Sequence, residues 1–155
     1  MHHDAAKASF QGELWTQDKA WCNDIPPGVN VIQSADGKGL SDDPAVIHQG
    51  ANSGYQAINL AYHFGARTIL LLGFDMQGVG THWFGKHDAP GLSAGTDYAT
   101  LVNAFRTIKP ERHGIEIINC SRRTALDCFP RMDLHEALQQ ARHHPRHRAE
   151  PGRAA

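Results

Sequence analysis

Residues 52–75, NSGYQAINLAYHFGARTILLLGFD, decide the fold class because they place a helical pattern directly before a buried-strand pattern. From Ser53 onward, apolar residues recur at the spacing of one helix stripe, and Gly65 stands where a left-handed residue commonly ends a helix. Residues 68–73 then form a continuous apolar run of strand length. Because such a run is typical of a central parallel strand buried on both faces, the stretch predicts one helix–strand unit of an α/β sheet.

Further elements before and after this unit repeat the alternation. Residues 29–33, VNVIQ, are rich in β-branched side chains between turn residues and predict a short strand. Residues 97–108 predict a second helix, capped by Thr96 or Asp97, and residues 115–119, IEIIN, predict a second buried strand. A third helix is expected from about residue 133 to about residue 141. Strands that alternate with helices indicate an α/β layer fold with a largely parallel sheet.

The composition is that of one soluble globular domain. The chain has 155 residues, of which 41% are hydrophobic and 20% charged, so it is long enough to bury a core. We expect an irregular N-terminus over residues 1–12, a single α/β domain over residues 13–142 and a disordered tail over residues 143–155, where apolar residues are nearly absent.

The net charge argues against two classes of partner, and the cysteines indicate the cellular compartment. The 15 Lys plus Arg and 16 Asp plus Glu leave a formal charge of -1, so neither nucleic acid nor an anionic membrane is an expected partner. The longest apolar run is too short to span a bilayer. The 3 cysteines form no C-x-x-C pair and no signal peptide precedes them, which fits reduced thiols and predicts a cytoplasmic protein.

Element lengths predict where a ligand site would form. A helix over residues 53–64 would span roughly 18 Å and a strand over residues 68–73 roughly 20 Å. The helix start at Asn52, Ser53 and Gly54 and the strand end at Asp75 should therefore meet at the carboxyl edge of the sheet, where open α/β folds bind ligands. First-turn N–H groups suit a phosphate or carboxylate, and Asp75 could accept hydrogen bonds from a ribose or sugar hydroxyl. The alternative is that these residues only cap a helix and a loop.

The long Gly-rich loop over residues 74–96 carries the candidate catalytic groups. His82 and His87 could act as general acid or base at neutral pH, and Trp83 could shield the site or stack on a ring. The alternative interpretation is that the two histidines are surface side chains without a function. A metal site has less support and none is predicted, because only two nitrogens and the Asp88 carboxylate are near and no H-E-x-x-H or C-x-x-C spacing accompanies them.

Other polar residues carry weaker signals. Arg122 and Arg123 follow the strand IEIIN and could pair with a phosphate, although solvated loop arginines are the simpler interpretation. Cys120 and Cys128 are interpreted as small buried hydrophobes. The sequence contains no P-loop, G-x-G-x-x-G or G-x-S-x-G motif.

The order of these segments resembles two related protein groups. NSGYQAINLAYHFGARTILLLGFDM, then a loop with histidine, then IEIINCSRRTALDCFP resembles the bacterial sialyltransferases with a Rossmann-like fold. It also resembles a largely uncharacterised, phage-associated family akin to archaeal 6-hydroxymethylpterin diphosphokinase, and the quoted residues are most similar to that family. The match spans about residues 50 to 130. It implies a Rossmann-like three-layer fold.

The sialyltransferase resemblance implies a donor site at the helix start. Asn52, Ser53 and Gly54 would face the phosphate or the sugar carboxylate of a nucleotide-sugar donor, and Asp75 would face its ribose.

The same resemblance implies roles in the loop and in the late segment. Gln77 stands in place of one of the aromatic residues that help to hold the donor phosphate, and Trp83 would stand in for another. The catalytic base corresponds to His87 or His82. Ser121 matches the late Cys-Pro-Asn-Ser segment loosely, since CSRRT replaces it.

Three functions follow as expectations. The first is a nucleotide or nucleotide-sugar binding domain of a glycosyltransferase that needs no cofactor beyond its donor substrate. The second is pyrophosphoryl transfer to a pterin, which would require ATP and Mg²⁺. The third is a noncatalytic, phage-related remnant that acts by association, as a homodimer that covers an open sheet edge.

The N-terminus departs from both resembled groups. They begin with a strand and a Gly/Asn-rich turn that supplies half of the nucleotide site, and MHHDAAKASFQGELW matches neither. The expected fold is therefore an incomplete, N-terminally truncated doubly wound domain: either the chain is a fragment of a longer protein or its first half-domain has been lost.

Overall fold

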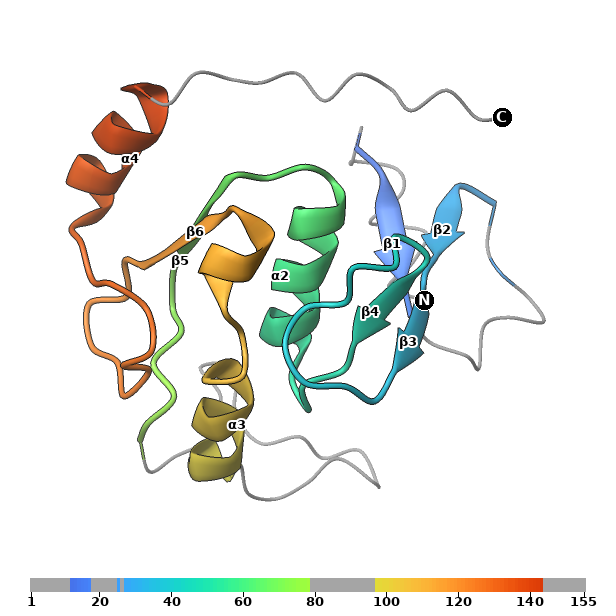
Figure 1. The fold of residues 1–155 in the computed structure, drawn as a ribbon, viewed down its shortest axis with the longest axis horizontal. Helices are drawn as coiled ribbons and strands as arrows, with labels where there is room; N and C mark the ends of the chain where they lie inside the picture. Colours follow the sequence, from blue (N-terminus) through green and yellow to red (C-terminus); the bar gives the residue numbers. More distant parts are fainter. Residues whose placement is uncertain (1–11, 18–24, 26, 79–96, 144–155) are drawn as a thin grey trace.

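The computed structural model describes residues 12–17, 25, 27–78 and 97–143 (Figure 1). Their elements run in the order β1 (Leu14–Thr16), β2 (Val29–Val31), β3 (Gln33–Ala35), β4 (Val46–His48), α2 (Ser53–His63), β5 (Thr68–Leu71), α3 (Tyr98–Phe105), η2 (Pro110–His113), β6 (Glu116–Asn119) and α4 (Leu134–His143). Every strand pair among these elements is parallel. The predicted α/β class and the parallel pairing are confirmed, whereas the strands form three separate pairs instead of one continuous sheet within the described residues.

β2 and β3 form one extended run that is interrupted only at Ile32. β1 pairs along the first half of this run and β4 along the second half. The N–H of Ile32 donates to the carbonyl of Thr16 at 3.0 Å, and the N–H of Gln33 donates to the carbonyl of Ala45 at 3.1 Å. The sequence predicted one strand over residues 29–33 and missed β1 and β4. Each of these has only 3 residues, too few to show a hydrophobic period.

β5 and β6 form the third pair, in a register that sets Leu71 beside Asn119. Both elements were predicted, but the apolar run of β5 is not buried throughout. Leu71 is 2% exposed, whereas Leu72 is 55% exposed. The strand ends because Gly73 adopts a φ of 73°, a left-handed conformation that turns the chain out of the sheet. The prediction of burial on both faces is therefore wrong at Leu72.

Three aromatic rings make the centre of the hydrophobic core. Tyr55 of α2 and Phe105 of α3 are both fully buried and meet edge to face at 5.6 Å between ring centroids. Phe105 meets the ring of Phe74, just after β5, at 5.8 Å. Edge-to-face pairs add about 0.5–1.5 kcal/mol beyond the burial of their surface. The rings thus fix α2, α3 and the segment after β5 to one another.

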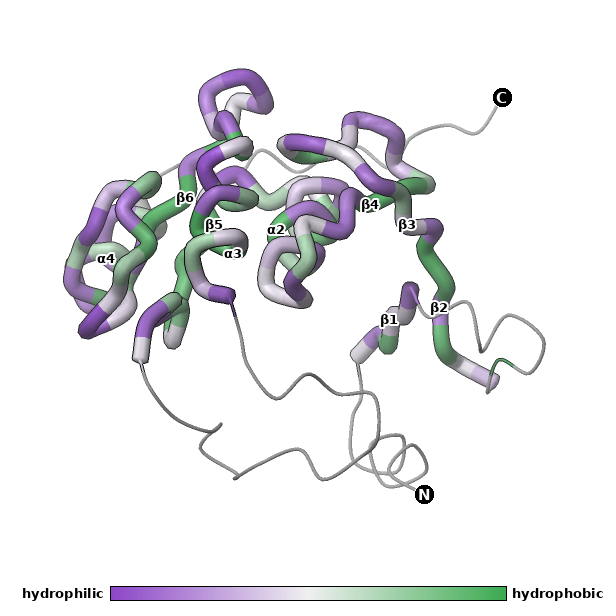
Figure 2. Tube along the Cα trace, turned by 90° about the horizontal axis from the view of Figure 1, so that it is seen from below, coloured by the Kyte–Doolittle hydropathy of each residue, from purple (hydrophilic) through white to green (hydrophobic). Residues whose placement is uncertain are grey.

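Helix α2 lies between the β5–β6 pair and the β3–β4 pair in both views (Figure 1, Figure 2). Asn59 of α2 is fully buried. Its Oδ1 accepts hydrogen bonds from the N–H groups of Ser41, at 2.9 Å, and His48, at 3.0 Å. Its Nδ2 donates to the carbonyl of Ser41 at 3.3 Å. A single amide therefore connects the helix to β4 and to the loop before it.

The three predicted helices are confirmed, with changes at their ends. The second was expected to reach residue 108, but α3 ends at Phe105. The hydrogen bonds there span three residues instead of four: the N–H of Thr107 donates to the carbonyl of Ala104, and that of Ile108 donates to the carbonyl of Phe105. Residues 1–11 and 144–155, which make up most of the predicted irregular N-terminus and tail, lie outside the described residues.

We predict that Asn59→Ala destabilises the fold by about 2–5 kcal/mol, because it leaves two N–H groups at a buried site without an acceptor. Asn103→Ala is the matched control: this asparagine lies on an exposed part of α3, and among the described residues its side chain bonds only to Arg106. Its change should stay within about 0.5 kcal/mol. Urea denaturation of both variants tests the difference, and equal midpoints would contradict the role given to Asn59.

Candidate functional site

A surface hollow of about 550 Å³ lies at the carboxyl edge of the β5–β6 pair, and we call it the carboxyl-edge hollow. Its wall comes from the turn after β5, the turn after β6 and the start of α4. The side chains that matter below are Leu72, Asp75, Ser121, Arg122, Arg123 and Leu134. This is the edge at which open parallel sheets bind ligands, because loops diverge there from the strand ends.

The turns after β5 and β6 are joined first by backbone and hydroxyl groups. The N–H of Cys120 donates to the carbonyl of Leu71 at 2.9 Å, which extends the β5–β6 ladder by one bond. The N–H of Phe74 then donates to Oγ of Ser121 at 2.8 Å. Ser121 is only 4% exposed, so this hydroxyl belongs to the framework of the wall.

A second set of hydrogen bonds joins the same two turns farther along the chain. Oγ1 of Thr124 donates to the carbonyl of Phe74 at 2.6 Å, and the N–H of Ala125 donates to the carbonyl of Asp75 at 2.8 Å. The backbone that carries Asp75 is thereby held by the neighbouring turn.

Asn119, the last residue of β6, organises the turn that follows it. The side chain is fully buried. Its Oδ1 accepts from the N–H of Ser121 at 3.0 Å, and its Nδ2 donates to Oγ1 of Thr124 and to the carbonyl of Leu126, both at 3.2 Å. One amide thus sets the shape of the segment that carries the two arginines of the hollow.

Helix α4 begins at the rim of the hollow. Oδ1 of Asp133 accepts from the N–H of His135 at 2.8 Å and caps the helix. Just before it, Arg131 donates from Nη2 to the carbonyls of Ser121 and Arg122, at 3.2 and 3.1 Å. Arg131 therefore ties the α4 side of the wall to the turn after β6.

Three charged groups of the hollow are free to meet a ligand. The side chains of Asp75, Arg122 and Arg123 are exposed, and none has a hydrogen bond or ion pair with any residue in the described ranges. Met76, directly after Asp75, adopts a φ of 49°, which is uncommon for a residue other than glycine. Backbone strain of this kind clusters at functional sites. The wall thus combines two cations and one carboxylate with the apolar side chains of Leu72 and Leu134.

The cysteines near this edge are poor nucleophiles at neutral pH. Burial, together with the charge of Asp133, raises the pKa of Cys120. Burial raises the pKa of Cys128 further, to about 11. Both are free thiols. Because the thiolate is the reactive form, neither is suited to nucleophilic catalysis without a further activating group.

The helix start lies beside Phe74, as the matching lengths of helix and strand predicted. Asn52 caps α2, since its Oδ1 accepts from the N–H groups of Gly54, at 2.7 Å, and Tyr55, at 3.2 Å. A Cβ on Gly54 would lie 2.7 Å from the ring of Phe74. Asn52 and Gly54 thus have structural roles, as the helix cap and as the residue that packs against Phe74, while Ser53 is exposed. None of the three lines the carboxyl-edge hollow, and their role in ligand binding stays a prediction.

The remaining predicted residues fall into two groups. Gln77 is exposed and does not line the hollow. His82, Trp83 and His87 lie outside the described residues. Of the predicted binding residues, the structure therefore brings together Asp75 and Ser121 in one wall.

Sequence reasoning missed several parts of this wall. Leu72 was interpreted as core, and Leu134 only as a helix residue. The buried amide of Asn119 and the cap of Asp133 were not singled out. Asp133 could have been found, because an aspartate directly before a helix pattern is a capping signal and the helix after β6 returns from the same sheet edge.

No group of three or more His, Cys, Asp or Glu side chains within the described ranges could hold a metal ion. No helix in those ranges combines the length and apolarity that a membrane span requires. Comparisons of the chain with family models, curated proteins and solved structures find no match.

We predict that Gly54→Ala destabilises the protein by about 1–3 kcal/mol, although alanine is ordinarily the better helix former, because the new methyl group must displace the ring of Phe74. Ser53→Ala, at the exposed neighbouring position, is the control. Thermal unfolding of both variants tests the contact. A Gly54→Ala protein as stable as the parent would show that the ring moves aside without cost.

We also predict that iodoacetamide at about pH 8 modifies Cys120 faster than Cys128, because a pKa of about 11 leaves roughly a thousandth of Cys128 as thiolate. Peptide mass mapping follows each thiol separately. Denatured protein is the control, in which both should react at similar rates. Equal rates in the folded protein would contradict the effect of burial on Cys128.

Proposed function

We propose that the carboxyl-edge hollow binds a nucleotide or nucleotide-sugar, and that the chain is a domain of the glycosyltransferase type. The observation that carries the proposal is that two arginines and a carboxylate, which have no partner among the described residues, line one hollow with an apolar surface at the carboxyl edge of parallel strands. A nucleotide presents the same three chemical features: phosphates, hydroxyls and a ring with apolar faces.

Each feature of the wall has a counterpart in such a ligand. Arg122 and Arg123 would make charge-assisted hydrogen bonds with the phosphates. Asp75 would accept hydrogen bonds from ribose or sugar hydroxyls, as acidic residues do in nucleotide-binding folds. Leu72, which is 55% exposed, and Leu134 would cover one face of the base or sugar ring.

The finer expectations rest on the resemblance of the sequence. They are an incomplete Rossmann-like, doubly wound fold and sugar transfer with His87 or His82 as the base that deprotonates the acceptor. The parallel strands and the ligand edge support the fold. The two histidines lie outside the described residues, so their part in the proposal depends on the sequence alone.

Calorimetry with cytidine and uridine mono- and diphosphates, and their sugar conjugates, tests the binding. Asp75→Ala and the double change Arg122→Met/Arg123→Met should each weaken binding about tenfold or more, as expected when charge-assisted hydrogen bonds are lost. Arg142→Met is the matched control, because this exposed arginine of α4 does not line the hollow. Absence of binding by the parent protein would reject the proposal.

Protection of Cys120 gives an independent measure of the same site. Because Cys120 lines the hollow, a bound nucleotide should slow its alkylation while that of Cys128 stays constant. Repeating the assay with ATP in the presence and absence of Mg²⁺ separates the alternatives. Protection that requires both would favour pterin diphosphokinase chemistry.

A further inference from the structure

A second hollow, of about 240 Å³, lies near the opposite, amino end of β5, at the turn that joins α2 to that strand. We call it the amino-edge hollow. Asp42, Tyr62, His63, Arg67 and His113 supply its polar wall. They come from the loop before β4, the last turn of α2, the start of β5 and the end of η2. None of them belongs to the carboxyl-edge hollow.

One carboxylate oxygen fixes the imidazole of this wall. Oδ1 of Asp42 accepts from the hydroxyl of Tyr62 at 3.0 Å and lies 2.9 Å from Nδ1 of His113. A carboxylate only accepts, so Nδ1 of His113 carries the proton in this contact. The ring of His113 also packs edge to face on Tyr62, at 5.0 Å between centroids. His113 is therefore held in one orientation, with 8% of its side chain exposed.

This arrangement keeps Asp42 ionised. The hydrogen bond from Tyr62, followed by the hydrogen bond and charge of His113, holds the pKa of Asp42 below its ordinary value. The charge of Arg112 acts in the same direction. With one oxygen shared by two donors, Asp42 serves to position His113 and leaves the remaining nitrogen, Nε2, for other partners.

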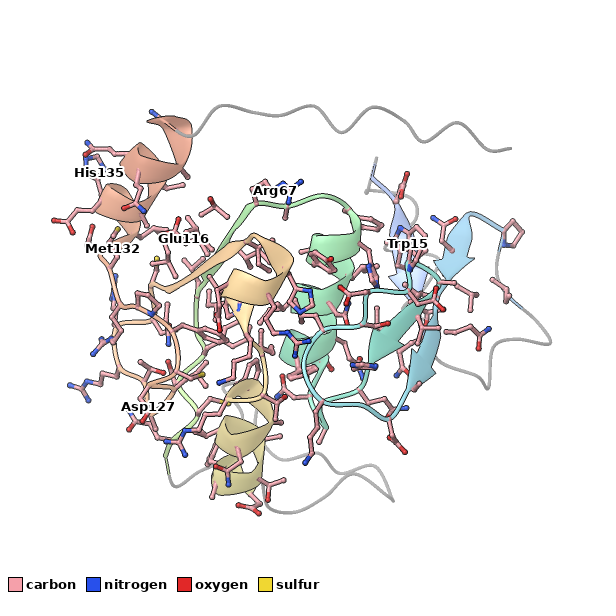
Figure 3. All side chains as sticks on the ribbon, in the orientation of Figure 1. Trp15, Arg67, Glu116, Asp127, Met132 and His135 are labelled. Carbon is pink, nitrogen blue, oxygen red and sulfur yellow. The ribbon has the colours of Figure 1, made fainter. Side chains whose placement is uncertain are left out.

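Arg67 lines the same hollow as this imidazole. Figure 3 shows Arg67 at the turn between α2 and β5. Its Nη1 lies 3.8 Å from the place of a Cβ on Gly114, the residue after His113. The guanidinium makes no hydrogen bond or ion pair with the residues that the structure describes. A cation and an oriented imidazole thus share one small hollow.

The other histidine of the wall is already engaged. Nε2 of His63 lies 2.9 Å from the carbonyl of Val46 and 3.1 Å from Nδ2 of Asn59. That nitrogen belongs to the contacts of α2 with β4. The groups left to bind a ligand are therefore the guanidinium of Arg67 and Nε2 of His113.

We propose that the amino-edge hollow is a second binding site, which takes the phosphate group of a small ligand between Arg67 and His113. Arg67 would donate two N–H groups to phosphate oxygens, and the Nε2–H of the imidazolium would donate to a third oxygen. Asp42 holds the ring in place through Nδ1 on the far side. The ligand is either inorganic phosphate or a simple phosphate monoester, because both present the same three oxygens.

NMR of the histidine rings, with inorganic phosphate titrated at about pH 6.5 against sodium chloride of equal ionic strength, tests this site. The His113 ring signals should shift saturably with phosphate and not with chloride. Arg67→Met should weaken the binding about tenfold or more. Arg142→Met is the matched control, since this exposed arginine of α4 lines neither hollow and its loss should leave the affinity unchanged.

Further arms separate this site from the carboxyl-edge hollow and identify the ligand. Arg122→Met/Arg123→Met should leave the His113 response unchanged, so the result is independent of the proposed nucleotide site. A methyl phosphate titration that matches inorganic phosphate supports a monoester ligand, and weaker binding supports phosphate itself. No shift of His113 in the parent, or equal weakening by Arg67→Met and Arg142→Met, would overturn the proposal.

Discussion

The buried amide of Asn59 is the connection on which the arrangement of this molecule depends. Strands β4 and β5 do not pair in the described residues, so α2 has to join the strand pairs on its two sides. Apolar packing alone would allow the helix to rotate or slide. An amide that accepts two backbone N–H groups and donates to a carbonyl fixes one position, because every other position would leave those groups unsatisfied.

The two hollows show different ways of preparing side chains for a ligand. At the carboxyl edge, the side chains of Asn119 and Thr124 bond to each other and to the backbone, and the charges of Arg122 and Arg123 have no partner among the described residues. At the amino edge, a charged group does the positioning, because Asp42 orients His113. In both cases the framework is internally satisfied, and the cations that would meet a phosphate have no partner among the described residues.

The sequence predicted the parts of the fold that have a long period or a cap. The helix after Asn52 and the strands of β5 and β6 could be found because their apolar patterns extend over many residues. β1 and β4 could not, since their existence depends on pairing with residues 29–35. That the start of α2 lies near the end of β5 followed from matching lengths, whereas the contact with Phe74 itself was not predicted. The sequence did not predict that Gly54 makes room for the ring of Phe74, because tertiary packing decides which group fills the space beside a glycine.

The contacts that hold the carboxyl-edge wall differ on its two sides. The turn after β5 is bonded to the turn after β6 and is also pressed against Gly54 through Phe74. The start of α4 is held by Arg131 and, farther along, by the bond of Gln140 with Glu116. Two kinds of contact therefore fix the wall: backbone hydrogen bonds and ring packing hold the turn after β5, whereas the side chains of Arg131 and Gln140 hold α4.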